Sequence, residues 1–334
     1  MLKKILKKNE AILLLIILIF IIVLTSFNRS FFTLENWFDM IKNNSGMMIL
    51  AIGFLVVLLS GGIDLSFTAI GIFCSYMATN ILVLSKIDNM LLAFMIACGV
   101  GIILGAINAF IIYFFKIPPL ITTLGTYAIF NGGLLLLAEN KSFYASDLPK
   151  AYKSFGSLNL FTITKSGGER YGLSIFIVIV VAIILITWFI LRFTMLGKGI
   201  YAVGGNPESA KRSGFNIMKI YFFVYCYMGL LAGIAAMMEA TLLQSVILVG
   251  YSVVDLSVIA AVILGGARLA GGYGTISGAI FGVIILIILK GNLVLIGLSS
   301  FWNEFIIGLV IIIGVIITTL QAKQKNLGIS IIEA

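Results

Sequence analysis

Residues 11–27 read AILLLIILIFIIVLTSF, a stretch without one charged side chain. A bilayer core is crossed by about 20 mostly apolar helical residues, so a stretch of this length predicts a membrane span. Lys3, Lys4, Lys7 and Lys8 precede it, as in a signal peptide, but no small-x-small cleavage site follows it. Because many more apolar stretches come later in the chain, we predict that this first span is retained.

The composition excludes a water-soluble globule. Of the 334 residues, 61% are hydrophobic and 10% are charged, against about 25% charged in ordinary soluble domains. Nine further stretches read as spans: about 45–60, 65–84, 90–115, 119–138, 171–193, 218–240, 252–267, 274–290 and 301–320. We therefore predict an all-α polytopic membrane protein of about ten transmembrane helices, with residues 1–334 as one transmembrane domain. The 252–267 stretch is short and ends in glycines, which is typical of a broken or re-entrant span.

The net charge of +9 is explained by the predicted topology. If the N-terminus lies in the cytoplasm and the spans alternate, the inner segments contain thirteen Lys and Arg against four acidic residues, and the outer segments contain nine of each. Cytoplasmic loops of membrane proteins carry an excess of Lys and Arg. The surplus thus lies on one side, which predicts that both termini are cytoplasmic and that the charge does not indicate nucleic-acid binding.

Two loops between the predicted spans are long. Residues 139–170 are polar, carry mixed charge and are expected outside, where they would form a cap or dock a partner. Residues 194–217 are expected inside, and Pro207 and Gly214 there predict a short helix that starts at a capped N-terminus and ends at a glycine. A short helix at the cytoplasmic surface would give a separate energy-supplying domain a contact through which it could move the spans of a permease. An ordinary amphipathic connector would have the same pattern.

Glycines recur within and between the spans. Glycine pairs occur at 61–62, 132–133, 265–266 and 271–272. GxxxG spacings occur at Gly101/Gly105 and at Gly274/Gly278/Gly282. Such spacings let helices pack closely in lipid, although most multi-span bundles contain them.

Two short strings in the chain echo each other. Residues 63–66 read IDLS and residues 254–257 read VDLS. In the predicted topology the first lies near the inner face and the second near the outer face. An inverted repeat would give this arrangement, and such repeats place transport sites between their halves. Three shared residues also arise by chance, so both interpretations stay open.

The sequence contains no sign of an enzyme site. It has no histidine, and Cys74, Cys98 and Cys226 lie in apolar stretches without metal-ligand spacing. The phosphate-loop pattern of many ATPases is absent, and the nearest string, at 197–199, lacks its leading glycine and its Ser or Thr. We therefore predict no catalytic residue, metal or cofactor on this chain. Energy for transport would come from an ion gradient or from another subunit.

Polar residues within or beside the spans are the candidates for a translocation path. Four carboxylates, at Asp64, Glu239, Asp255 and Glu304, fall near span ends and also suit a role as helix caps. Neutral polar residues inside spans are Asn108, Thr122, Thr123, Thr126, Asn131, Thr241 and Gln244. For the path itself we predict Asp64, Ser66, Asn108, Thr122, Asn131, Asp255 and Ser257. Hydrogen bonds between helices are the alternative role for each of them.

Five motifs carry a resemblance to a known family. Glu208-Ser209-Ala210-x-x-x-Gly214 resembles the Glu-Ala-Ala…Gly loop of bacterial ABC importer permeases, with Ser209 in place of alanine. SGGIDLS at 60–66, AVGGN at 202–206, DLSVIAAVILGG at 255–266 and LAGGYG at 269–274 look like the ribose/simple-sugar and autoinducer-2 permease family. The resemblance covers about 45–320. Members often have Glu-Leu-Asp-Ala-Ile-Ala-Ala where this chain has VDLSVIAA at 254–261.

The resemblance implies a multi-pass permease of the bacterial cytoplasmic membrane that works with partners. These are a second permease copy or sister permease, a cytoplasmic ABC ATPase that holds ATP and Mg, often as two fused nucleotide-binding domains, and an extracytoplasmic sugar-binding protein. The cargo would be a pentose, a hexose or an autoinducer-like furanose. The residues implied to couple to the ATPase are Asn206, Pro207, Glu208, Ser209, Ala210 and Gly214. A nucleoside ABC permease and a gradient-driven secondary carrier are the alternatives.

Overall fold

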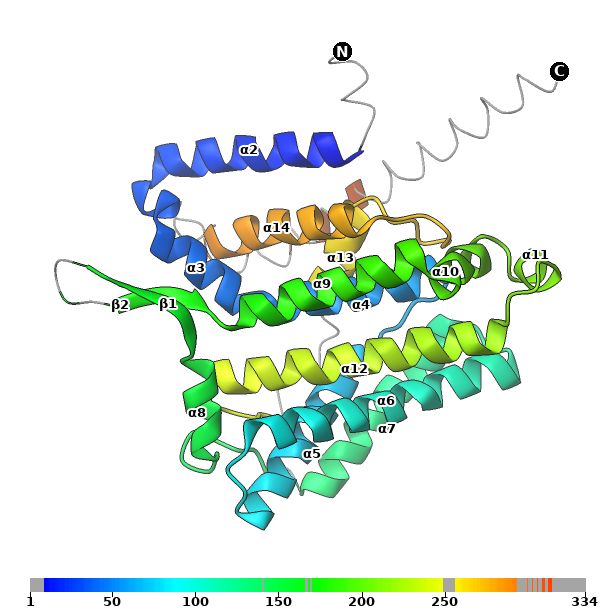
Figure 1. Ribbon diagram of the computed structural model, residues 1–334, viewed down its shortest axis with the longest axis horizontal. Coiled ribbons are helices and arrows are strands. Elements are labelled where there is room, and N and C mark those ends of the chain that lie inside the picture. Colours follow the sequence, from blue (N-terminus) through cyan, green and yellow to red (C-terminus); the bar gives the residue numbers. More distant parts are fainter. Residues whose placement is uncertain are drawn as a thin grey trace.

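The computed structural model describes residues 9–139, 141–165, 168, 170–248 and 256–292, and beyond them only 299, 302, 305, 308, 309, 312 and 313. Most of the helices run along one common direction (Figure 1). The end of the bundle that holds the helix α11 is called the α11 end. The opposite end, which holds the β1–β2 hairpin, is called the hairpin end (Figure 1).

The elements follow one another in this order: α2 (Asn9–Phe27), η1 (Arg29–Phe32), α3 (Leu34–Asn43), α4 (Ser45–Leu59), α5 (Phe67–Ser85), α6 (Met90–Phe115), α7 (Pro119–Ala138), α8 (Lys150–Gly156), β1 (Asn159–Thr164), β2 (Arg170–Ser174), α9 (Phe176–Phe193), α10 (Met195–Gly205), α11 (Pro207–Arg212), α12 (Ile217–Leu243), α13 (Leu256–Leu264) and α14 (Ile276–Asn292).

Six of the described helices are long and apolar enough to cross a membrane: α2, α5, α6, α7, α9 and α12. The pair α3–α4, bent by 51°, gives a seventh if it is counted as one span. This confirms a polytopic, predominantly helical membrane protein. The described part of the 252–267 stretch consists of the nine-residue α13 and the three residues after it. At 1.5 Å per residue α13 is about 14 Å long, which is too short to cross a bilayer core by itself. The predicted span at 301–320 lies almost wholly outside the described residues.

The long loop predicted at 139–170 contains secondary structure that the sequence did not indicate. It holds α8 and the strand β1, which pairs antiparallel with β2 so that Phe161 lies opposite Leu173 and Ile163 opposite Tyr171. The span predicted at 171–193 therefore begins later, at Phe176, because its first residues belong to β2. Short apolar runs do not distinguish a strand from the start of a helix, which explains the wrong boundary.

Helix α8 is held against the bundle at the hairpin end. The fully buried Tyr152 shares a hydrogen bond of 2.8 Å between its hydroxyl and Oγ1 of Thr79 on α5. Burial raises the pKa of Tyr152 to about 12, so its hydroxyl keeps its proton at physiological pH. The Ala151 N–H donates to Oδ1 of Asp88 at 2.7 Å. These contacts make α8 a fixed cap on the spans.

The centre of the bundle is α12, which packs against α6, α4 and α5. The closest approach is to α6, where a Cβ placed at Gly101 would overlap the carbonyl oxygen of Gly229, and a Cβ placed at Gly229 would overlap that of Gly101. A Cβ at Gly105 would likewise overlap the backbone of Tyr225. The GxxxG spacing on α6 is thus a helix-packing site, as predicted. The second GxxxG series serves α14, since Gly278 and Gly282 meet the α13 segment in the same way.

We expect Gly101→Ala to destabilise the protein by about 1–3 kcal/mol, the usual cost of forcing extra volume into a packed site. The measurement is the midpoint of thermal unfolding in detergent. Gly99→Ala on the same helix is the matched control, because its added methyl group would have no atom within 4 Å. Equal midpoints for the two variants would contradict the close packing of α6 on α12.

Candidate functional site

The irregular segment between α4 and α5, residues 60–66, carries a buried polar network. Oδ1 of Asp64 accepts hydrogen bonds from the backbone N–H of Ser66 at 2.7 Å and from its hydroxyl at 2.6 Å. Nδ2 of Asn108 on α6 donates to Oγ of Ser66 at 2.7 Å. All three side chains are fully buried. The structure thus brings together three of the residues that the sequence predicts for the path. Asp64 also accepts the backbone N–H of Ser66, the N-cap residue of α5, as expected of a carboxylate just before a helix.

Thr123 on α7 fixes the same segment from another side. Its hydroxyl donates to the carbonyl oxygen of Ile63 at 3.0 Å and accepts from the N–H of Leu65 at 3.1 Å. The hydroxyl of Tyr225 on α12 lies against Gly62, where a Cβ would overlap it. The sequence marks Thr123 as a polar residue in a span but contains no signal for these contacts, because they depend on how α7 and α12 pack.

Several polar atoms around this segment remain open for further hydrogen bonds. Among the described residues, these buried atoms have no protein partner: Oδ2 of Asp64, Oδ1 of Asn108, Oγ1 of Thr68, Oγ1 of Thr122 and the hydroxyl of Tyr225. A buried polar group without a partner costs about 1–3 kcal/mol. These buried atoms therefore keep unused hydrogen-bonding capacity in and around the segment.

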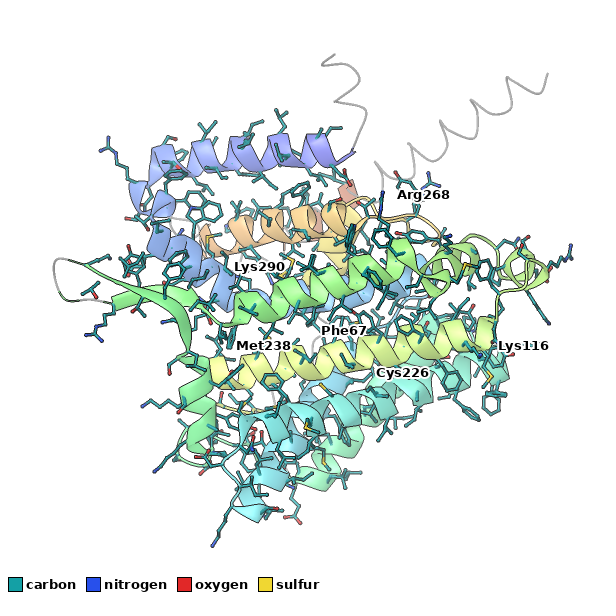
Figure 2. All side chains as sticks on the ribbon, viewed as in Figure 1. Phe67, Lys116, Cys226, Met238, Arg268 and Lys290 are labelled. Atoms are coloured by element: carbon teal, nitrogen blue, oxygen red, sulfur yellow. The ribbon has the colours of Figure 1, made fainter. Side chains whose placement is uncertain are left out.

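A cavity of about 770 Å³ extends from the hairpin end to the first turn of α5. This volume lies within the range of about 300–1,000 Å³ that is usual for small-molecule sites. At the hairpin end it is lined by Asn43, Asn44 and Glu239, and at its inner end by Phe67 and Thr68. Figure 2 shows Phe67 about midway along the bundle, while Lys116 lies at the α11 end. The inner end of the cavity thus follows directly after the polar segment that ends at Ser66.

The opposite wall of the cavity comes from α13 and α14. Nζ of Lys290 donates to Oγ of Ser257 at 2.6 Å, and both residues line the cavity. The lining therefore includes a cation and a hydroxyl from this wall, together with Glu239 of α12. Lys290 was not predicted as a path residue, since only the packing of α13 on α14 brings it to Ser257.

The other predicted path residues lie elsewhere. Thr122 is buried in α7 and Asn131 is half-buried on the same helix, and neither is among the residues that line the cavity. Asp255 lies outside the described residues. Of the seven predicted residues, Ser257 lines the cavity and Asp64, Ser66 and Asn108 lie beyond its inner end.

The short helix predicted in the 194–217 loop is present as α11. Oδ1 of Asn206 caps its N-terminus by accepting from the N–H of Ser209 at 2.9 Å. At its C-terminus, Gly214 has a φ of +87°, its N–H donates to the Lys211 carbonyl at 3.0 Å, and the N–H of Phe215 donates to the Ala210 carbonyl at 3.1 Å. This is the Schellman arrangement of a glycine-terminated helix.

Helix α11 turns one face to the protein and the other to solvent. Ala210 is buried, whereas the side chains of Glu208 and Arg212 are 87% and 84% exposed. The helix lies at the tip of the α11 end (Figure 1). A short, capped and exposed helix at the end of a membrane bundle is a surface on which another protein can act.

Comparisons with known proteins show that the chain is similar to transport proteins. Residues 38–315 match the family described as branched-chain amino acid transport system / permease component. The chain is 31% identical over 297 residues to the ribose import permease protein RbsC of Escherichia coli (strain K12), covering 89% of each chain. It is 29% identical over 317 residues to the galactose/methyl galactoside import permease protein MglC of Haemophilus influenzae, covering 91% of this chain and 92% of the relative. It is 31% identical over 312 residues to the autoinducer 2 import system permease protein LsrC of Yersinia pseudotuberculosis, covering 93% and 85%. No solved structure matches the chain.

We expect Ser66→Ala to destabilise the protein by about 1–3 kcal/mol, because it leaves Asp64 and Asn108 buried without their shared partner. Thermal unfolding in detergent measures the change. Ser75→Ala on α5, the helix that follows Ser66, is the control, since the Ser75 hydroxyl bonds the carbonyl oxygen of Ile72 one turn away on the same helix. A smaller loss in Ser66→Ala than in Ser75→Ala would show that the network does not hold the α4–α5 segment.

Proposed function

Because the chain belongs to the family of branched-chain amino acid transport system permease components, we propose that it moves a simple sugar, or a furanose such as autoinducer 2, through the bacterial inner membrane. As the permease component of an ABC importer it is a multi-pass membrane subunit without enzymatic activity of its own. Its relatives are named for the import of ribose, of galactose and methyl galactoside, and of autoinducer 2. Family membership favours ATP-driven import over a gradient-driven carrier.

The observation that carries this proposal is the cavity whose inner end, at Phe67 and Thr68, adjoins the polar α4–α5 segment. Its lining mixes apolar groups with amide, hydroxyl and charged groups, among them Asn44, Thr68, Glu239, Ser257 and Lys290. Such a wall offers hydrogen bonds to a solute rich in hydroxyl groups from several sides. Beyond the inner end, the open oxygens of the polar segment supply the next set of partners along the same direction.

The proposed orientation puts the hairpin end outside the cell and the α11 end in the cytoplasm. The distribution of Lys and Arg supports this orientation. The proposed ten-span topology adds the 252–267 stretch, α14 and the 301–320 stretch to the seven spans above, and both termini are then cytoplasmic. Because α13 alone is too short, the 252–267 span would have to include the residues that precede α13. In this orientation the end of the cavity lined by Asn43, Asn44 and Glu239 is nearer the outside, and the polar segment lies between its inner end and the cytoplasm.

The partners follow from this orientation. An ABC permease implies an ATPase and a binding protein. We propose that a sugar-binding protein docks on α8 and the β1–β2 hairpin, and that a cytoplasmic ATPase with two nucleotide-binding domains, which supplies the ATP and Mg, contacts residues 206–214. A second copy of the chain or a sister permease completes the transporter.

The transport cycle needs two packings of the bundle that are close in free energy. A partner that binds one packing more tightly shifts the population toward it. The loaded binding protein would favour the packing with an open outer cavity, and the ATPase would drive the change by moving α11. The permease itself then needs only weak contacts with the sugar, which allow release.

We expect Thr68→Trp to abolish uptake, because the indole would fill the inner end of the cavity. The measurement is uptake of radiolabelled ribose, galactose, autoinducer 2 and a nucleoside by cells that carry the transporter as their only uptake system for each solute. Val181→Trp on the exposed face of α9 is the control. Uptake in Thr68→Trp at the level of the control would rule out this cavity as the route, and uptake of the nucleoside alone would select the nucleoside permease.

We expect Glu208→Lys to reduce uptake and the amount of ATPase that co-purifies, while the amount of permease in the membrane stays unchanged. The substitution reverses the charge of an exposed side chain at the start of α11, where a helix N-terminus favours a negative group. Lys116→Glu, at the same end of the bundle but outside the 194–217 loop, should leave both quantities unchanged (Figure 2). Normal uptake in Glu208→Lys would argue against α11 as the coupling surface.

A further inference from the structure

Three separate turns of the chain meet at the α11 end through glycines, and we call this contact the glycine junction. It consists of Gly61 in the α4–α5 segment, Gly204 in the last turn of α10, and Gly271 and Gly272 in the turn between α13 and α14. Three of these four glycines have a positive φ, namely +82°, +86° and +69° at positions 61, 271 and 272. At those three positions other residues would be strained.

The junction is made of backbone atoms. A Cβ placed at Gly204 would overlap the carbonyl oxygen of Leu59 and lie 2.6 Å from the N atom of Gly272. A Cβ placed at Gly271 would lie 2.5 Å from the Cα of Gly61. The N–H of Gly272 donates to that same Leu59 carbonyl at 3.0 Å. The end of α4, the end of α10 and the α13–α14 turn therefore touch without any side chain between them.

The junction is close to α11 in the chain, because Gly204 belongs to α10, the helix just before α11. Helix α11 packs mainly on α10, and Gly204 is only three residues before Pro207. A second bond reinforces the connection, since the hydroxyl of Tyr201 on α10 donates to the carbonyl oxygen of Gly274 at 3.1 Å. A displacement of α11 would therefore reach α10 first and, through α10, the two turns.

Both turns lead to the cavity. The α4–α5 segment continues from Gly61 through the buried polar network to Thr68 at the inner end of the cavity. The α13–α14 turn joins the two helices that carry Ser257 and Lys290, which form one wall. One point of contact thus connects α11 to both the inner end and a wall of the cavity.

We propose that the glycine junction transmits the displacement of α11 to the cavity, with Gly204 as the positioning residue on which the transmission depends. The inference rests on the proposed function, because it assigns the motion to coupling with an ATPase. Backbone contacts suit this task because they have no rotamers through which a displacement can be absorbed. The glycines 61, 204, 271 and 272 would therefore move with α11 as one unit.

The first test compares Gly204→Ala with Gly205→Ala in proteoliposomes that contain the ATPase and the binding protein. A Cβ at Gly205 would have no atom within 4 Å, so this neighbour on the same helix is the matched control. We expect Gly204→Ala to keep its ATP hydrolysis but to transport about tenfold less sugar per ATP, the change that about 1.4 kcal/mol of misfit produces. The ratio in Gly205→Ala should equal that of the unmodified chain. An unchanged ratio in Gly204→Ala would overturn the proposal.

A second measurement leaves the junction intact and so does not depend on the folding of Gly204→Ala. Spin labels are attached to cysteines introduced at exposed positions, as Ser213→Cys with Leu269→Cys, or as Ser213→Cys with Lys116→Cys, after Cys74, Cys98 and Cys226 are replaced by alanine. On addition of ATP to the complex, the distance between positions 213 and 269 should stay constant, while the distance between 213 and 116 changes. An equal change in both distances would overturn the proposal.

The two failures are distinguishable. If the unmodified chain transports none of the tested solutes, the proposed function fails, yet the spin-label distances still report whether α11 and the α13–α14 turn move together. If the unmodified chain transports sugar and Gly204→Ala transports it with the same yield per ATP, the proposed function is upheld and the junction has no part in coupling.

Discussion

The contact of α12 with α6 is the constraint on which the rest of the bundle depends. Lipid tails are as apolar as leucine, so close packing rather than hydrophobic burial holds helices together in a membrane. The missing side chains at Gly101, Gly105 and Gly229 let the two backbones touch. With α12 fixed in this way, α4 and α5 pack on its other sides, and the cavity is the space that remains between them and the α13–α14 pair.

A second constraint is that backbone groups within a membrane need partners inside the protein. Irregular backbone at membrane depth is tolerated only where it is buried in protein or lines a cavity. The α4–α5 segment meets this condition because Thr123 bonds both Ile63 and Leu65, and Asp64 bonds Ser66. Oδ2 of Asp64 in this segment has no protein partner. A solute with hydroxyl groups would supply the missing hydrogen bond when it passes. The same segment thus joins α4 to α5 through buried hydrogen bonds and, in the proposed function, continues the polar route.

The sequence predicts those parts of the protein that depend on local signals. Six or seven of the ten predicted spans, the GxxxG contact of α6 and the short helix α11 agree with the sequence prediction. Hydropathy, glycine spacing and the positions of Pro207 and Gly214 each act over a few residues, which is why these features were predictable. The β1–β2 hairpin was missed because its second strand runs into an apolar span. The bond between Lys290 and Ser257 was missed because the two residues are 33 positions apart and meet only through tertiary packing. All seven path residues, and the coupling role of residues 206–214, remain predictions.

A permease must not be open at both ends at once, so the parts that line its route have to move together. Side-chain contacts adapt to small displacements by changing rotamers, which would let the wall and the inner end of the cavity move independently. Contacts between backbones have no such freedom, and packed interfaces of this kind switch between discrete arrangements rather than deforming continuously. The contact of Gly61, Gly204 and Gly271 makes the α4–α5 segment and the α13–α14 turn neighbours of the same helix, α10, which leads into α11. Concerted motion of the cavity then follows from geometry, without a long chain of polar contacts between the two ends.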